Sequence, residues 1–225
     1  MKPLRVPGAA TQGWLVLIGG GEFSFGETKE IDRFLVSKMP SERPTVAFLP
    51  TASGSSEYGH HFGTYLKSVE PRVDVINVPI YRSRDARRGK NIDAVHSAGM
   101  IYLGGGVAET LLDVLRDSPL LAAIQEALSQ GAIVAGIGAG AAAMGAFTAG
   151  VSSEALVGLD LVPESAIVTG FNPAEDESLR RLMSLPQVTL GIGIPPVAAL
   201  AIGPDRQAEI IGDLPVAVMR RGSNS

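Results

Sequence analysis

Four short turns rich in glycine and hydroxyl side chains follow apolar runs, and these turns are the places in the sequence best suited to chemistry. They read GGGE at residues 19–22, TASGSSE at 51–57, GGGV at 104–107 and GIGAG at 136–140. Glycine lets backbone N–H groups approach a ligand closely, and the N-terminus of a following helix favours a negative group. In an open parallel sheet, such turns meet beyond the carboxyl ends of the strands. The predicted ligand-binding residues of this crevice are Gly20, Gly21, Glu22, Thr51, Ser53, Gly105, Gly106, Gly138 and Ala139.

The stretch GAIVAGIGAGAAAMGA, residues 131–146, has the pattern of a strand, a sharp turn and a helix on which a hydrolase mounts its nucleophile. The turn position that would carry the reactive side chain is Gly138. Residues 131–153 also carry no charge, and this segment is long enough for a membrane-spanning helix. Because the glycines of this stretch weaken any helix that contains them, a buried strand and helix is the preferred interpretation, and we expect no contact with a membrane.

Other side chains could supply an acid, a base or a metal ligand. Glu22 and Glu109 each follow a glycine turn, where they could act as acid and base or simply favour the start of the next helix, and we prefer the second interpretation. His60 and His61 are adjacent on a predicted helix, and His96 is expected near a helix C-terminus. The sequence has no cysteine, and its histidine spacing matches no zinc site, so we predict neither a metal nor a cofactor.

Apolar runs that alternate with helix-period segments position these turns. The runs at 14–19, 45–50, 73–78, 100–105 and 132–136 are predicted strands, and helical spacing falls at 31–35, 58–66, 118–131 and 176–183. Ser56 and Ser118 are the predicted N-caps of two of these helices, and Gly131 is a predicted stop. This alternation predicts an α/β fold, a three-layer sandwich with a mostly parallel central sheet.

The length of 225 residues suits one domain over residues 1–225, with a flexible arm at 1–12 and a flexible tail at 220–225. After about residue 156 the pattern changes to short strand-like segments, which we expect to complete the same sheet. The net charge of −4 gives no general attraction to nucleic acid. The basic run RSRDARRGK at 82–90 has no aromatic residue, and we interpret it as a solvated loop.

Several segments together resemble the cyanophycinase and dipeptidase E family of serine peptidases, which has a class I glutamine amidotransferase-like (flavodoxin-like) fold. GIGAGAAAMG is similar to the nucleophile turn of that family, LIGGGE to its first strand and turn, FLPTASG to its second, and IYLGGGVAETL to its oxyanion segment. VGLDLVPESAIVTGF and LGIGIPPVAALAIG resemble the segments that follow the nucleophile. The resemblance covers about residues 14–219.

The resemblance also implies that the catalytic side chains are replaced. The family's serine falls on Gly138 and its histidine on Gly170, while its acidic pair falls on Pro195 and Pro196. The amide side chains of its oxyanion segment are lost at Gly106 and Val107. A nucleophile, its base and its orienting acid act as a unit, so we expect no serine-peptidase activity and no catalytic residue among these positions.

The expected function is therefore that of a cytoplasmic binding or regulatory pseudoenzyme. The resemblance implies a small peptide or amino-acid-like ligand with an acidic group, and we expect action through a homodimer or through a catalytically competent partner. The alternative is a hydrolase of peptide or amide substrates that uses a relocated catalytic set such as Glu22, Glu109 or His60.

Overall fold

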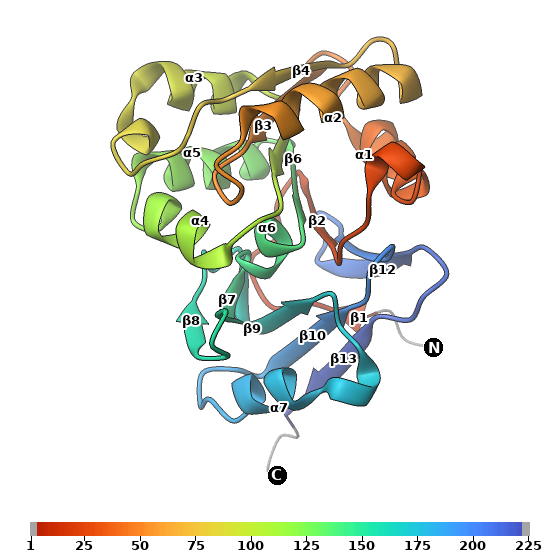
Figure 1. The fold of residues 1–225 in the computed structure, drawn as a ribbon, viewed down its shortest axis with the longest axis vertical. Helices are drawn as coiled ribbons and strands as arrows, with labels where there is room; N and C mark the ends of the chain where they lie inside the picture. Colours follow the sequence, from red (N-terminus) through yellow and green to blue (C-terminus); the bar gives the residue numbers. More distant parts are fainter. Residues whose placement is uncertain (1–3, 222–225) are drawn as a thin grey trace.

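The computed structural model describes residues 4–221, and its main element is a twisted eight-stranded sheet between two layers of helices (Figure 1). The strand order is β1-β12-β11-β2-β6-β5-β3-β4. The five strands that are parallel to one another are β2 (Trp14–Ile18), β6 (Ile133–Ile137), β5 (Met100–Leu103), β3 (Thr45–Leu49) and β4 (Asp74–Asn77). These match the predicted strands to within a residue or two, since fully apolar runs belong in a sheet covered on both faces.

Alternate side chains of these strands enter two separate cores. Helices α1 (Lys29–Lys38) and α2 (Ser56–Val69) pack on one face, which contains Phe48 and Tyr102. Helices α3 (Gly89–Ser97), α4 (Ala108–Leu115) and α5 (Pro119–Ser129) cover the other face. The predicted three-layer α/β architecture is confirmed.

Two of the three predicted helix signals are confirmed. The hydroxyl of Ser118 accepts a hydrogen bond from the Leu121 N–H at 3.1 Å, and Gly131 follows α5 with a φ of 95°. The N-cap predicted at Ser56 is wrong, because Ser55 holds the cap position and Ser56 is the first residue of α2. The side chain of Ser55 makes no capping bond there, so the hydroxyl pattern SS marked the helix start without marking the cap.

The C-terminal third departs from the expectation that it completes the same sheet. Only β11 (Ala199–Ile202) and β12 (Gln207–Ile211) join the large sheet, where they run antiparallel to their neighbours. A second, five-stranded sheet has the order β13-β10-β9-β7-β8. Its strands are β13 (Ala217–Arg220), β10 (Leu190–Ile194), β9 (Val162–Thr169), β7 (Gly145–Ala149) and β8 (Ala155–Val157).

The second sheet shares a core with the first and has its own outer cover. Ile167 and Ile192 belong to the core under α4 and α5, whereas α7 (Glu177–Met183) packs on the opposite side through Leu179 and Leu182. Figure 1 shows α7 beneath β10 and β13, at the bottom of the view. The parallel β7–β9–β10 arrangement satisfies the backbone groups of these strands within the second sheet.

The structure describes part of the predicted arm and part of the predicted tail. Leu4 and Arg5 form β1, which pairs with β12, and Val6 is buried. At the other end Arg220 lies in β13, and the Arg221 guanidinium donates to the carbonyl of Pro186 at 2.9 Å. The remaining parts of the predicted arm and tail, residues 1–3 and 222–225, lie outside the described residues.

Candidate functional site

A sharp turn connects β6 to the short helix α6 (Ala139–Ala142), and Gly138 is its pivot. Its φ of 53° and ψ of −118° are a backbone conformation that a residue with a side chain adopts only under strain. A Cβ added at Gly138 would meet no atom within 4 Å, whereas one added at Gly140 would lie 2.2 Å from the Leu103 carbonyl oxygen. Gly140 therefore allows α6 to approach β5, and Gly138 leaves open space at the turn.

The turn after β2 joins this pivot to the other positions that the resemblance singles out. The Gly138 N–H donates to the Ile18 carbonyl at 2.9 Å, and the Gly170 N–H donates to the Gly19 carbonyl at 2.9 Å. The Val197 N–H, next to Pro196, donates to the Gly20 carbonyl at 3.0 Å.

Three positions far apart in the sequence, 138, 170 and 197, thus meet at three successive carbonyls of one turn, and Pro195 and Pro196 directly precede the third. Gly170 has a φ of 61°, and a Cβ added there would also meet nothing within 4 Å. Pro195 is buried and Pro196 is exposed, and neither side chain carries a titratable group.

The backbone around the turn holds N–H groups that have no backbone acceptor. Within residues 4–221, no backbone hydrogen bond uses the N–H of Gly105, Gly106 or Ala139. Gly105 lies beside the turn, since a Cβ added to it would be 3.4 Å from the Ile137 carbonyl oxygen. The first residue of α6 follows Gly138 directly, so the positive end of the helix dipole lies at the same turn. This arrangement can stabilise a negative oxygen placed against the turn.

The two hydroxyl residues predicted for the crevice differ in their contacts. The Ser53 side chain stabilises the turn at 51–57, because its hydroxyl donates to the Pro50 carbonyl at 3.2 Å and accepts from the Ser55 N–H at 3.2 Å. Thr51 is 1% exposed, and its Oγ1 has no hydrogen-bond partner within the described part of the chain. Buried hydroxyls normally have a partner, so Thr51 has unused hydrogen-bonding capacity at the end of β3.

The carboxylates that could form a relocated catalytic set are engaged locally. Glu22 caps the 3₁₀ turn η1 (Phe23–Phe25) by accepting from the Ser24 N–H at 3.3 Å, which confirms the capping interpretation. Glu109 lies in the first turn of α4 and accepts from the Val151 N–H at 2.6 Å. Among the described residues, no hydrogen bond connects Glu22, Glu109 and His60.

The histidines lie outside this turn. His60 and His61 are exposed on α2, with ring centroids 6.0 Å apart. His96 lies in the last turn of α3, as predicted, and its Nε2 is 3.4 Å from a carboxylate oxygen of Glu126. Within residues 4–221, no group of three or more histidine and acidic side chains is close enough to hold a metal ion.

Sequence reasoning missed a cluster of polar side chains around the buried Asp32, behind Glu22. Asp32 of α1 is fully buried, and its Oδ2 accepts from the Thr28 hydroxyl at 2.7 Å and from the Tyr65 hydroxyl at 2.8 Å. Burial raises the pKa of Asp32, although the two hydrogen bonds lower it in part. Burial also raises the pKa of Tyr58 to about 12, together with the negative charges of Glu22 and Asp32. The signal in the sequence was the Thr28–Asp32 spacing of four residues beside apolar Ile31.

Next to this cluster, Tyr58, Tyr65 and His61 line an open cavity of about 500 Å³ together with Glu22. In the described part of the chain, no helix combines the length and apolar character needed to cross a membrane.

Comparisons with known proteins identify the family of this chain. The model of Peptidase family S51 matches residues 15–210. The Bacillus subtilis (strain 168) protein called "Uncharacterized peptidase YgaJ" is 32% identical over 133 residues, which are 56% of this chain and 54% of that relative. The match thus spans about half the length of the relative.

Two solved structures share the fold. The crystal structure of a peptidase from an acI-B1 actinobacterium has a TM-score of 0.75 at 23% identity, over 96% of this chain and 97% of the other. That of a putative peptidase E protein from Listeria monocytogenes EGD-e has a TM-score of 0.56 at 16% identity, over 93% and 99%. The family match covers most of the chain and confirms the resemblance inferred from the motifs: this protein belongs to Peptidase family S51.

Proposed function

We propose that this S51-family protein has lost serine-peptidase chemistry and acts as a binding or regulatory pseudoenzyme. The observation that carries the proposal is the turn at Gly138, which keeps the strained backbone of a nucleophile turn but has no side chain. Acyl transfer through a serine needs a nucleophile and a base within hydrogen-bond reach. Glycine at 170, joined to the same β2 turn, provides no base.

The ligand that we propose is a small peptide or amino-acid-like molecule with a carboxylate. The N–H groups of Gly105 and Ala139 can donate to its oxygens. The open spaces beside Gly138 and Gly170 leave room for atoms of the ligand where side chains would otherwise lie. Backbone donors at the start of a helix are a common way to bind a carboxylate.

The activity part of the proposal is tested with a fluorophosphonate probe and with substrates. The purified chain is incubated with the probe, with aspartyl dipeptides and with an aspartate–arginine polymer. We expect neither labelling nor hydrolysis, and robust turnover or labelling would overturn the proposal. The regulatory part, a cytoplasmic homodimer or a complex with an active partner, is tested by measuring the mass of the particle in solution, where a monomer would exclude the homodimer.

The ligand part is tested by calorimetry with an aspartyl dipeptide and a pair of matched variants. Gly138→Leu fills the open space at the turn and should abolish binding. Gly26→Leu is the control, because Gly26 also has a positive φ (77°) and open space at its Cβ but lies outside the predicted ligand residues. Binding that is absent in the unmodified chain, or that Gly138→Leu leaves intact, would reject the proposed ligand site.

A further inference from the structure

A strongly basic loop follows β4 on the side of the large sheet that α3, α4 and α5 cover. Residues 82–90 contain five basic side chains and one acidic side chain in a chain whose net charge is −4. The loop touches α4, since the Ser83 hydroxyl donates to the Asp113 carbonyl at 3.3 Å. The basic residues are Arg82, Arg84, Arg87, Arg88 and Lys90.

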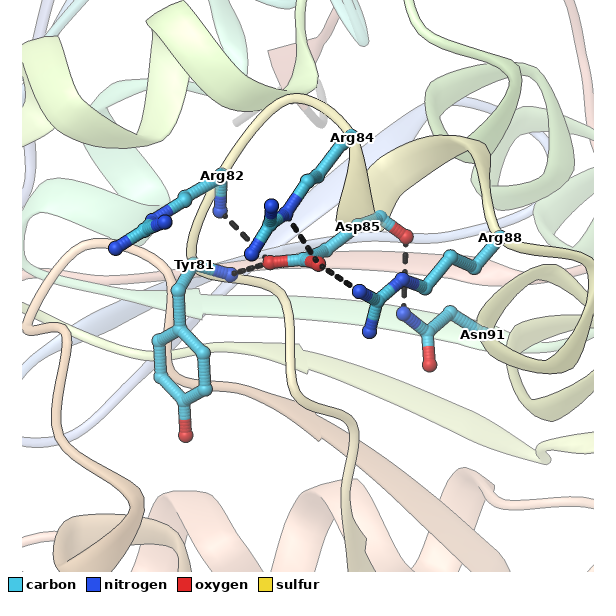
Figure 2. Close-up of polar contacts among 6 residues, drawn as sticks. All are labelled: Tyr81, Arg82, Arg84, Asp85, Arg88 and Asn91. Carbon is cyan, nitrogen blue, oxygen red and sulfur yellow. Dashed lines mark hydrogen bonds and ion pairs between the residues drawn. The ribbon is translucent and has the colours of Figure 1, made fainter.

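The loop is wound around the buried carboxylate of Asp85, whose side chain is 8% exposed (Figure 2). Its Oδ2 accepts from the N–H groups of Tyr81 and Arg82 at 3.2 and 3.1 Å. The Asp85 carbonyl accepts from the buried Asn91 amide at 2.9 Å, which ties the loop to α3. The basic side chains are solvated, as predicted, but the backbone that carries them is held in place.

The remaining carboxylate oxygen of Asp85 positions two of the arginines. Arg84 Nε lies 3.9 Å and Arg88 Nη2 lies 3.4 Å from Oδ1, and Figure 2 shows the two guanidinium groups reaching it from different sides. In the same view the Arg82 guanidinium points away from Asp85. Burial by itself would raise the pKa of Asp85. The N–H groups of Tyr81 and Arg82 and the two guanidinium groups lower it by more, so the pKa is below its usual value and the carboxylate stays ionised.

This arrangement has spare hydrogen-bond donors. The Asp85 carboxylate accepts two hydrogen bonds, both at Oδ2, while Oδ1 forms only the two ion pairs, and its one negative charge faces two guanidinium groups. Each guanidinium carries several N–H groups, yet within residues 4–221 no hydrogen bond uses the side chain of Arg82, Arg84 or Arg88. All three line one open cavity of about 400 Å³, together with Pro79, Tyr81 and Asp85, so the lining holds three guanidinium groups and one carboxylate.

We propose that this cavity binds the phosphate group of a small, multiply charged anion. A phosphate dianion offers more oxygens and more charge than a single carboxylate, and therefore matches three guanidinium groups better. Helix α3 begins at Gly89, directly after Arg88, and its positive end adds to the attraction. The site is separate from the glycine crevice and does not depend on the function proposed for it.

The test is a calorimetric titration of inorganic pyrophosphate into the full chain at constant ionic strength, with chloride as the balancing anion. We expect saturable binding with a Kd below about 1 mM. Arg84→Gln/Arg88→Gln should weaken binding about a hundredfold, since each of the two lost hydrogen bonds to a charged group contributes about tenfold. Lys29→Gln/Arg33→Gln removes the same charge from exposed positions on α1 and is the matched control.

Arg82→Gln keeps the proposal testable if the double variant unfolds, because the Arg82 side chain makes no contact with Asp85. We expect it to weaken pyrophosphate binding while thermal stability is unchanged. The proposal is overturned by an absence of saturable binding, by equal weakening in the α1 control, or by succinate binding as tightly as pyrophosphate. Binding that is weakened only by the loop variants supports it.

Discussion

The replacement Gly138→Ser tests whether a nucleophile alone could restore peptidase chemistry. The new side chain would enter open space, since a Cβ at this position meets nothing within 4 Å. The replacement lowers the stability of the fold through the backbone, because a residue with a side chain is strained at a φ of 53° and a ψ of −118°. Strain of this kind costs about 1–3 kcal/mol, which lowers the melting temperature of a domain of this size by roughly 2–12 °C.

The added serine should still be inactive. A nucleophile that lacks its base loses about a millionfold in kcat relative to a complete triad. We therefore expect no detectable hydrolysis of aspartyl dipeptides and no fluorophosphonate labelling of Gly138→Ser. The control Gly26→Ser places a serine at another open position with positive φ, and it should be equally unreactive.

Adding the base as well provides the complementary measurement. Gly138 and Gly170 donate to the successive carbonyls of Ile18 and Gly19, so side chains at 138 and 170 start from neighbouring points of one turn. We expect Gly138→Ser/Gly170→His to regain slow fluorophosphonate labelling that neither single variant shows. Turnover by Gly138→Ser alone would refute this reasoning, since another residue would then act as the base.

Four further replacements test the packing and the buried acids. Gly140→Ala should destabilise the fold by more than about 3 kcal/mol in urea denaturation, because its Cβ would lie 2.2 Å from the Leu103 carbonyl, whereas Gly138→Ala should cost less. Because burial raises the pKa of Asp32, the stability that its proton contributes is present at low pH and is lost as the pH rises from 3.8 through the raised pKa. Asp32→Asn should remove that loss from melting curves between acidic and neutral pH, and an unchanged pH profile would contradict the assignment. The pKa of Asp85 is lowered, so its contribution is present above 3.8 and disappears as the pH falls through the lowered pKa. Asp85→Ala should therefore destabilise the chain at pH 7 by about 1–3 kcal/mol, with a smaller difference in acid.

The central strands could be predicted because their signal is local. β2, β3, β5 and β6 are short apolar runs, and a run of this kind must be covered on both faces wherever it lies in the sheet. The α5 cap was readable for the same reason, since Ser118, Pro119 and Gly131 act on neighbouring backbone groups.

The second sheet could not be predicted in this way. The segment AIV of β9 and the strand LGIGI of β10 have the same kind of apolar pattern as the strands of the large sheet, and the pattern does not say which strand is the neighbour. Pairing is decided by which backbone groups remain unsatisfied after the chain has collapsed, and that depends on contacts far apart in the sequence. The pairing of Leu4 with Ala208 is of the same kind.

The site divides along the same line. Its glycine turns, with glycine at position 138, can be recognised from the sequence alone, because residue type and order carry that information. The meeting of 138, 170 and 197 at three carbonyls of the β2 turn, the unused Thr51 hydroxyl and the guanidinium groups around Asp85 were decided only by tertiary structure. Hydrogen bonds and charges act over a few ångströms in space, and only folding sets those distances.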